Sequence, residues 1–367
     1  MQFKKVLFAC ILVVLVELLF LNYYYGPASK KKSKSSGYRL LTAGDLPDDG
    51  PDLFEKMFPD WDQVSSNSSD SDDPFDQDST DIIHPELPEK DIFVLFLVTS
   101  MPESFERRQL IRTTWANTWK SNKKDGKAAK SLYKRRGQPD VTIYCVFMVG
   151  ISTIAKYNRR IAKEASILGD IYRTKIEESY RNMIFKVWDA YKWALGVSPK
   201  YIFKADDDIY VNIPRLIHWL KTDQNIKENL YAGYVVYKQK IERDEENDWF
   251  VNSTDLQQGT YPNYCIGPYY IFSGNLLEGL IHAASKRQKF PVEDAYMGVV
   301  MRDNYVTPYN VGNSLFIYDG SHGVLALEYT EEKLKHAVCI GERLQAKHIQ
   351  QLHERYVYIR KRIDGKL

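Results

Sequence analysis

The sequence predicts an α/β domain with a mostly parallel sheet covered by helices on both faces, preceded by an amino-terminal membrane helix and a polar stem. Three observations predict this architecture. Continuous apolar runs at Ile92–Thr99, Val141–Val149 and Tyr201–Ala205 are typical of strands buried on both faces. A helical pattern separates the last two runs, and alternating strands and helices favour a parallel sheet. One long apolar run, Val6–Tyr25, stands near the amino terminus.

The composition is that of a globular protein. Of 367 residues, 44% are hydrophobic and 27% are charged, which excludes a collagen, a wholly disordered chain and a polytopic membrane protein. Four cysteines exclude a disulfide-dense scaffold. Residues 45–91 carry 16 acids and 2 bases, whereas residues 92–367 carry 41 bases and 31 acids. The larger part is therefore basic, which suits an anionic ligand or a membrane surface, while the near-neutral total gives no indication of nucleic acid.

The run Val6–Tyr25 is apolar apart from Glu17 and Asn22. As a helix it would rise about 30 Å, roughly the thickness of the hydrocarbon layer. It ends in three tyrosines, which are typical of the membrane interface. The alternative is a cleaved signal peptide, which the length of the run and Pro27 disfavour. We therefore predict a tail over 1–5 and a single signal-anchor helix over 6–25.

Residues 26–91 are rich in Ser, Asp, Pro and Gly, so they are expected to form a disordered acidic stem. Lysines on both sides of the apolar run leave its orientation open. The sequons that begin at Asn67 and Asn252 favour a location outside the cytosol, and both asparagines are candidate glycosylation sites. The folded domain is expected to span 92–367.

A helix is expected over Tyr180–Leu195, because its apolar residues recur at helical spacing. Ser179 would cap its amino terminus, and Gly196 and Pro199 would end it. Ligands of such sheets bind beyond the carboxyl ends of the strands, and the next motif falls there.

Asp206, Asp207 and Asp208 directly follow Ala205 at the end of the third run. Adjacent carboxylates repel one another and lose hydration when partly buried, and a divalent cation would offset both costs. Because alternate residues of an extended chain point the same way, Asp206 and Asp208 are expected to face one ion while Asp207 turns aside. Oxygen ligands suit Mg²⁺ or Mn²⁺ better than zinc. The alternative is an acidic turn that caps a helix near Pro214.

Glu293 and Asp294 form a second acidic site, after Pro291 and before a helical pattern that runs through Met301. The helix dipole favours acidic residues in the first turn, which would explain Glu293 and Asp294 without a catalytic role. The functional alternative is a general base at the rim of a cleft. The local sequence leaves both interpretations open.

Arg108 and Arg112 follow the first strand and share one helix face, because they stand four residues apart. Such a face can meet a nucleotide phosphate. The alternative is a pair of structural salt bridges.

The segment Tyr261–Tyr270 is expected to be a turn crowded with aromatic rings. Gly267 and Pro268 would fix a tight backbone there, and tyrosine rings make good platforms for sugars. An aromatic patch of the core beside a turn is the alternative.

Together these segments resemble the β-1,3-glycosyltransferase family, which includes β-1,3-galactosyltransferases and β-1,3-N-acetylglucosaminyltransferases, with the fringe enzymes as more distant relatives. The resemblance runs from about Ile92 to about Arg302. A triple aspartate alone would be weak support, but five motifs in the family's order are specific. They lie at residues 108–115, 169–171 with 178–182, 203–208 with 211–212, 261–267, and 293–298.

The resemblance implies a GT-A fold, a UDP-sugar donor, Mn²⁺, and inversion at the anomeric carbon. It implies transfer of a hexose, with galactose favoured and an N-acetylhexosamine as the alternative, to the 3-hydroxyl of a sugar on a lipid or protein. It also implies a single-pass type II Golgi membrane protein with a luminal catalytic domain, which fixes the orientation. Asp294 falls on the family's catalytic base, and Asp206 and Asp208 on its metal ligands. The candidate contacts to the donor are Arg108, Arg112, Asp206 and Asp207.

The chain departs from the family pattern at the metal site, which usually gains a histidine near the carboxyl terminus. Cys339 falls near that position here, and His322 and His336 are the other candidates. The third ligand is therefore open.

The cysteines also depart from the pattern. Relatives often carry cysteines where this chain has residues 197–199 and Met301, so Cys145 and Cys265 are expected to lack their usual partners. A Cys265–Cys339 bond is an alternative, and at least one of the three cysteines outside the membrane run is left unpaired.

Two other functional classes stay open. A membrane-anchored chaperone or lectin could keep the fold without turnover, but it would be expected to have lost the acid triplet or the base, and both are intact. A metal-dependent phosphohydrolase usually needs a two-metal cluster with histidines, and the seven histidines form no group with ligand spacing.

Overall fold

The computed structural model describes residues 53–58, 80–86, 91–116, 131–133, 141–223, 226, 228–318 and 325–363. The predicted tail, the membrane helix over 6–25, most of the stem, and Asn67 lie outside the described residues. Within the described residues, no helix combines the length and the apolar character needed to cross a bilayer.

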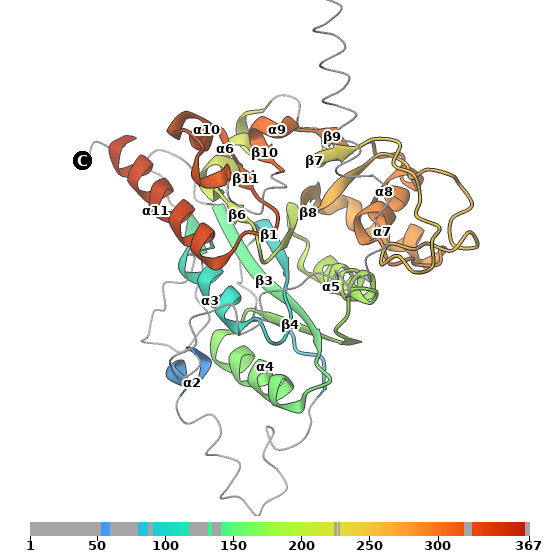
Figure 1. Ribbon diagram of the computed structural model, residues 1–367, viewed down its shortest axis with the longest axis horizontal. Helices are drawn as coiled ribbons and strands as arrows, with labels where there is room; N and C mark the ends of the chain where they lie inside the picture. Colours follow the sequence, from blue (N-terminus) through green and yellow to red (C-terminus); the bar gives the residue numbers. More distant parts are fainter. Residues whose placement is uncertain are drawn as a thin grey trace, which may run out of the picture. The chain divides into compact units, whose positions relative to one another are not determined.

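The chain alternates strands and helices through most of its described length (Figure 1). The strands are β1 (Ile92–Thr99), β2 (Ser131–Tyr133), β3 (Val141–Ile151), β4 (Ile171–Glu177), β5 (Tyr201–Asp206), β6 (Tyr210–Val211), β7 (Tyr231–Val236), β8 (Tyr264–Ser273), β9 (Tyr309–Asn310), β10 (Phe316–Ile317) and β11 (Cys339–Ile340). The helices are α2 (Leu53–Met57), α3 (Phe105–Thr113), α4 (Ala155–Leu168), α5 (Met183–Val197), α6 (Ile213–Thr222), α7 (Leu277–Ser285), α8 (Glu293–Asp303), α9 (Gly312–Leu315), α10 (Glu331–His336) and α11 (Ala346–Ile363).

The main sheet has the strand order β2-β3-β1-β5-β8-β7-β9, and β4 also pairs with β3. The pairs β1–β3, β1–β5 and β3–β4 are parallel, as the sequence predicts. Strand β8 is antiparallel to both β5 and β7, so the predicted parallel sheet continues into a mixed one. The chain moves from β1 to β3 on one side and reaches β5 on the other, which makes the β1–β5 boundary a topological switch point.

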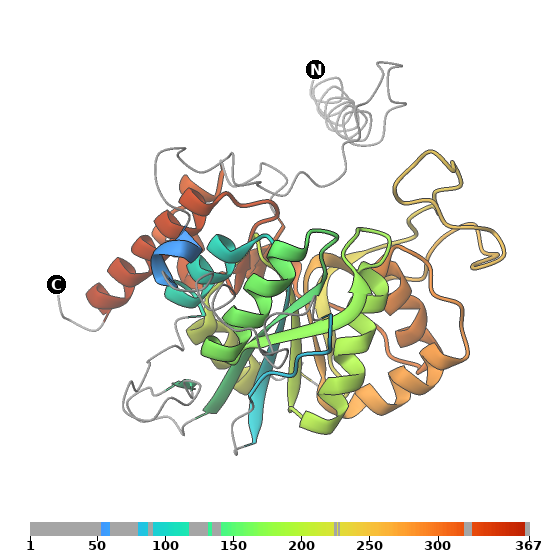
Figure 2. The same ribbon diagram turned by 90° about the horizontal axis from the view of Figure 1, so that it is seen from below.

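Alternate side chains of β1 enter two different cores, which confirms that helices cover both faces. Val94, Phe96 and Val98 belong to a cluster with residues of α3, α4, α6 and α11. Leu95 and Leu97 belong to a second cluster, with residues of α5, α7 and α8. In Figure 2 the orange helices α7 and α8 and the red helix α11 lie on opposite sides of the sheet. A strand buried on both faces reads as a continuous apolar run.

The predicted strands are confirmed with small changes in their bounds, and the predicted helix starts later. Helix α5 begins at Met183 rather than at Tyr180. The Ser179 hydroxyl accepts from the Asn182 N–H in a preceding turn, so Ser179 stabilises that turn and not the first turn of the helix. Ser198 adopts a left-handed conformation where α5 ends.

The expectation of a wholly disordered stem over 26–91 is wrong for two segments. The Phe54 side chain on α2 is fully buried and packs edge-on against Phe105 of α3, with ring centroids 5.0 Å apart. Arg160 of α4 covers the Phe54 ring and bonds Glu55 at 2.7 Å. Phe58 also packs edge-on against Phe105, with ring centroids 6.0 Å apart, so two aromatic rings dock this segment on α3.

The second docked segment, residues 80–86, runs along strand β4. Ile83 and Arg173 exchange two backbone hydrogen bonds of 3.1 and 3.0 Å. The Glu86 N–H donates to the Gly169 carbonyl at 2.8 Å. The packed domain therefore includes residues before the predicted boundary at Ile92.

A small second sheet of order β10-β11-β6 brings the carboxyl-terminal part of the chain to the end of β5. Ile340 of β11 pairs with Tyr210 of β6. Beyond β11, the Leu344 N–H donates to the Asp208 carbonyl at 2.8 Å. The acid triplet is therefore bounded by the loop after β11.

Candidate active site

The carboxyl ends of β1 and β5 meet at the switch point. Thr99 is the register partner of Asp206. The Thr99 hydroxyl donates to Asp206 Oδ1 at 2.5 Å, and the Ser100 hydroxyl donates to Asp207 Oδ2 at 2.8 Å. Two hydroxyl residues that end β1 thus orient two carboxylates that end β5. Open α/β sheets bind ligands at such an edge.

The three aspartates have different surroundings. The Asp206 side chain is 26% exposed, whereas Asp207 is 3% exposed and bonded to Ser100. Asp207 therefore turns aside, as the alternation predicts. The expectation that Asp207 contacts the donor is contradicted, because its carboxylate is directed into the domain.

Asp208 carries the strongest sign of a missing partner. Its Oδ1 is buried and has no hydrogen-bond partner. Burial raises the pKa of Asp208 to about 7, and the neighbouring carboxylates Asp206 and Asp207 add to the rise. A divalent cation would offset both the burial and the repulsion, so Asp206 and Asp208 fit a site for Mg²⁺ or Mn²⁺.

No third side-chain ligand is evident in the part of the chain that the structure describes. No group of three or more His, Cys, Asp or Glu residues there is arranged to hold a metal ion. Cys339 is fully buried inside β11, and His336 is exposed with its ring 2.9 Å from Glu332. His322 lies outside the described residues. A site with two carboxylates, completed by substrate phosphate and water, is a usual arrangement for Mg²⁺.

Arg107 of α3 interacts electrostatically with the triplet. Its guanidinium donates to the Leu344 carbonyl at 2.9 Å, and its Nε is buried without a partner. The pKa of Asp207 is raised by burial, and Arg107 opposes that rise. Arg107 also opposes the rise at Asp208. Its positive charge therefore offsets part of the negative charge of the triplet.

The expected phosphate contact of Arg108 and Arg112 is contradicted. Arg108 is fully buried and forms two hydrogen bonds with Glu164, of 2.8 and 2.7 Å. Arg112 holds Asp170 through two bonds of 2.8 Å and also bonds Glu164 at 2.6 Å. The face that both arginines share is the inner face of α3, so the alternative of structural salt bridges is correct.

Asp294, in the first turn of α8, lies at the same edge as the triplet. The Gly267 N–H donates to its Oδ2 at 2.7 Å, and the Ala295 N–H donates to its Oδ1 at 2.8 Å. Gly267 stands on β8, which runs antiparallel to β5, with Tyr269 opposite Ala205. Asp294 is partly exposed. Burial raises its pKa to about 6, which suits a base that works near neutral pH.

Glu293, the neighbouring acid, is directed into the domain. It is 5% exposed and accepts a 2.5 Å hydrogen bond from the Tyr270 hydroxyl. Burial raises its pKa to about 7, although Lys204 and the Tyr270 bond act in the opposite sense. Lys204 on β5 is 1% exposed, and its ammonium lies 3.9 Å from Glu293 Oε2. Of the two acids, Asp294 is the one that meets solvent.

The segment predicted to be an aromatic turn is mostly strand β8. Tyr261, Tyr264, Tyr269 and Tyr270 are at most 5% exposed. These rings belong to the core, which agrees with the alternative of an aromatic core patch. All three cysteines in the described residues are free and buried, so the Cys265–Cys339 bond is not formed.

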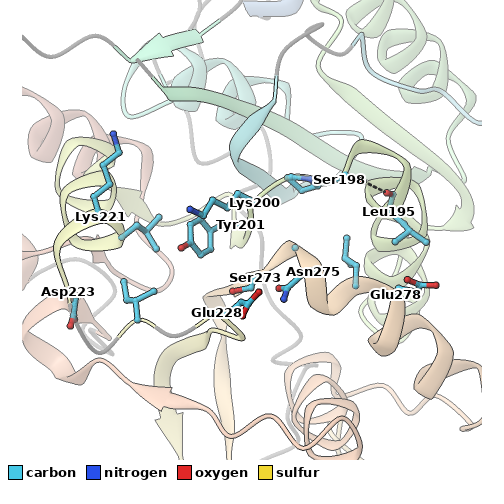
Figure 3. A pocket seen from close by; sticks show the side chains of 15 residues that line it. Leu195, Ser198, Lys200, Tyr201, Lys221, Asp223, Glu228, Ser273, Asn275 and Glu278 are labelled. Atoms are coloured by element: carbon cyan, nitrogen blue, oxygen red, sulfur yellow. Dashed lines mark hydrogen bonds between the residues drawn. The ribbon is translucent and has the colours of Figure 1, made fainter. Parts of the chain in front are cut away.

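A separate concavity of about 820 Å³ lies at the other end of β5 (Figure 3). Lys200 and Tyr201 stand at its centre, with Ser273, Asn275 and Glu228 close by. Tyr201 opens β5 and Asp206 closes it, about 16 Å apart at the usual strand rise. This concavity is therefore distinct from the edge that holds the acids.

The candidate glycosylation residue Asn252 is exposed, in a loop that precedes β8. Its Oδ1 accepts from the Thr254 N–H at 3.0 Å in a local turn. The side chain is accessible in this loop.

Sequence reasoning missed three residues that line or support this edge: Thr99, Arg107 and Lys204. Thr99 and Lys204 lie within the predicted strands. Each is a polar residue in an apolar run, and this interruption could have marked them as candidates. Lys204 in particular interrupts the apolar third strand, and a buried lysine requires a partner. Arg107 stands beside the face that Arg108 and Arg112 share. The spacing of these residues does not show which face of the helix points inward.

A family model described as galactosyltransferase matches residues 106–312 of the chain. The rat UDP-GlcNAc:betaGal beta-1,3-N-acetylglucosaminyltransferase 7 is 29% identical over 231 residues, which cover 61% of this chain and 54% of the relative. The human beta-1,3-galactosyltransferase 2 is 27% identical, with 60% and 49% covered. The mouse beta-1,3-galactosyltransferase 1 is 28% identical, with 62% and 66% covered. The chain thus spans about half to two thirds of the length of these relatives.

Solved structures of glycosyltransferases are also similar to this chain, with TM-scores below 0.5. The bifunctional glycosyltransferase WbbM has a TM-score of 0.40 at 9% identity, with 76% of this chain and 53% of that chain covered. The galactosyltransferase LgtC, in complex with donor and acceptor sugar analogues, has a TM-score of 0.33 at 8% identity, with 74% and 100% covered. Scores below 0.5 carry no functional argument.

Proposed function

The chain belongs to the galactosyltransferase family, and on that premise we propose that it is an inverting β-1,3-glycosyltransferase. The proposed reaction moves a hexose, with galactose favoured, from a UDP-sugar to the 3-hydroxyl of an acceptor sugar on a glycolipid or glycoprotein. We assign the domain to the GT-A class on the same family resemblance.

One observation carries the proposal: a partly exposed carboxylate and a crowded acid pair share one edge of the sheet. Asp294 is held by two backbone N–H groups, and its pKa is raised to about 6. Asp206 closes strand β5 at the same edge and Asp208 lies two residues beyond it, with an orphaned oxygen. A general base beside a metal site for the donor diphosphate is what a displacement at an activated sugar needs.

The proposed role of Asp294 is proton acceptance. Its carboxylate takes the proton of the acceptor hydroxyl while that oxygen attacks the anomeric carbon from the face opposite UDP. The two N–H donors fix the carboxylate, so its orientation does not depend on the substrate. General-base assistance of this kind is worth about 10²–10⁴-fold.

The proposed donor site uses the triplet. Asp206 and Asp208 would hold Mn²⁺, which supplies neutralisation of the diphosphate that departs. Thr99 orients Asp206 through the 2.5 Å bond, and Ser100 holds Asp207 out of the site. Arg107 adds a positive charge near the triplet, which favours an anionic donor.

A second donor class has support of its own. One of the similar relatives is a beta-1,3-N-acetylglucosaminyltransferase, and others are beta-1,3-galactosyltransferases. A UDP-N-acetylhexosamine would use the same base and the same acids. The donor sugar is therefore the variable to measure.

The proposed setting is the Golgi membrane, with a single-pass type II anchor and a luminal catalytic domain. The apolar run over 6–25 and the sequons at Asn67 and Asn252 support it.

The test is a donor panel. The purified protein is incubated with UDP-galactose, UDP-N-acetylglucosamine or UDP-N-acetylgalactosamine, Mn²⁺, and simple glycosides, and the product is identified by mass and linkage. A β-1,3-linked product that Asp294→Asn does not form would support the proposal. Hydrolysis of every donor without transfer, or no reaction at all, would contradict it.

A further inference from the structure

Lysine 204 is the only charged side chain in the strand segment Tyr201–Ala205, and it is 1% exposed. Its ammonium lies 2.6 Å from Asp206 Oδ1 and 3.9 Å from Glu293 Oε2, so two carboxylates pair with this buried cation. Buried cations of this kind are kept only with well-formed partners.

The ammonium of Lys204 has two strong hydrogen bonds that go in different directions. It donates to Asp206 Oδ1 at 2.6 Å and to the Gly267 carbonyl at 2.7 Å. The N–H of the same Gly267 donates to Asp294 Oδ2 at 2.7 Å. A continuous path of hydrogen bonds thus leads from Asp206 to Asp294, with one side chain and one residue's backbone between them.

The path leaves little freedom at its centre. A Cβ on Gly267 would stand 3.1 Å from Asp294 Oδ2, so the glycine permits the close approach of the carboxylate to the backbone. The Glu293 carboxylate flanks the ammonium at 3.9 Å and is itself fixed by Tyr270, whose hydroxyl lies 2.7 Å from that of Tyr191. Lys204 is therefore held from both sides.

We infer that Lys204 is a positioning residue that sets the metal-side carboxylate Asp206 and the base Asp294 in fixed register with each other. This inference rests on the proposed function, since it assigns those two acids to donor and acceptor chemistry. Lys204 touches neither substrate in this role. It acts by fixing the Asp206 oxygen at one end and the Gly267 peptide at the other.

The first prediction concerns geometry and needs no turnover. In Lys204→Met the Gly267 peptide loses its anchor, so hydrogen exchange in residues 264–268 should accelerate. Arg173→Met is the matched control, because Arg173 is also 1% exposed and bonds two carbonyls, of Asp81 and Asn158, at 2.9 and 3.2 Å. That control should leave the exchange of 264–268 at the wild-type rate.

The second prediction concerns transfer. Misplacing a reacting group by about 1 Å costs about 10²-fold, so kcat of Lys204→Met should fall by about that factor while the acceptor KM changes little. Lys204 lowers the pKa of Asp294, so its loss should move the acidic limb of the pH profile upward by about one unit. The other titratable groups near Asp294 are Glu293, Tyr231, Tyr261 and Cys265.

Loss of a buried cation also leaves carboxylates unbalanced, so the double variant Lys204→Met/Glu293→Gln serves as a second test of the same path. It removes one positive and one negative group, so it should fold even if Lys204→Met does not. The Gly267 carbonyl still lacks its hydrogen bond from Lys204 in this variant. Accelerated exchange at 264–268 in both variants, beyond that of Arg173→Met, would support the inference. Exchange at the wild-type rate in a folded variant, or an unmoved acidic limb, would overturn it.

The outcome is separable from that of the proposed function. If the wild-type protein transfers no sugar, the proposed function fails, and the exchange measurement alone decides whether Lys204 anchors Gly267. If the protein transfers sugar and Lys204→Met matches the wild type in rate, pH profile and exchange, only the role of Lys204 fails.

Discussion

The Gly267 N–H and the Asp294 carboxylate are joined by a 2.7 Å hydrogen bond across 27 residues of sequence. This bond seats the first turn of α8 against strand β8 and directs Asp294 to the edge where β5 ends. The same glycine accepts from Lys204, which also bonds Asp206. The two acidic motifs of the sequence are therefore parts of one arrangement.

Replacement of the base tests its assignment. Asp294→Asn keeps the size of the side chain, but its one amide oxygen can accept from only one of the two N–H groups, and it cannot accept the proton at neutral pH. Transfer should fall by about 10²–10⁴-fold, while the affinity for UDP should stay unchanged. Steady-state rates and UDP titrations measure both. Glu278→Gln, in the distant concavity, is the matched control. Wild-type transfer by Asp294→Asn would remove the base from the mechanism.

The pH dependence follows from the raised pKa of the same residue. Burial brings the pKa of Asp294 to about 6, and only the ionised form can accept a proton. Activity should thus be full above that pH and should fall about tenfold per unit below it. A profile of kcat/KM from pH 5 to 8 measures this limb. A rate that stays level down to pH 5 would show that no such group controls catalysis.

Crowding at Asp208 predicts a stability effect without metal. Its buried Oδ1 has no partner, and its neighbours are carboxylates. In the presence of a chelator at pH 8, Asp208→Asn should raise the melting temperature by about 2–4 °C, because it removes an unfavourable buried charge. Mn²⁺ with UDP should stabilise the wild type and not the variant. A variant that is less stable than the wild type in chelator would argue against the crowded site.

The buried network of α3 predicts a structural role for its arginines. Arg112→Met removes both side-chain hydrogen bonds of Asp170 and leaves Glu164 with Arg108 alone, so the unfolding free energy should fall by about 3–5 kcal/mol. UDP affinity, measured below the lowered melting temperature, should not change. Denaturant melts and UDP titrations report the two effects. Lost UDP binding with unchanged stability would revive the phosphate role.

The docked stem segment predicts a large effect from one ring. Phe54 is fully buried against Phe105, whereas its neighbour Leu53 is 38% exposed. Phe54→Ala should lower the unfolding free energy by about 3–5 kcal/mol, and Leu53→Ala should have little effect. Urea unfolding of the two variants makes the comparison. Equal midpoints would mean that α2 does not belong to the cooperative unit.

The core of the sheet could be predicted because its strands are buried on both faces, so β1, β3 and β5 read as apolar runs. Strand β8 could not, because Gly267 and Pro268 within it have the composition of a turn. The pairing of β8 with β5 and β7 joins distant segments and leaves no local periodic signal.

The candidate site was predictable where residue order decides geometry and not where packing does. The position of Asp206 and Asp208 at the end of β5 follows from the strand itself. The orientation of α3 depends on Glu164 and Asp170, which lie more than fifty residues away, so spacing alone selected the inward-facing Arg108 and Arg112. The docking of Phe54 is likewise a tertiary contact.

The most direct test of the central claim is calorimetry of UDP binding to the purified protein with and without Mn²⁺. The account predicts binding that requires Mn²⁺ and that disappears in Asp208→Ala, while Asp294→Asn binds as the wild type does. UDP binding that is indifferent to the metal and to Asp208, or no binding by the folded protein, would contradict the account.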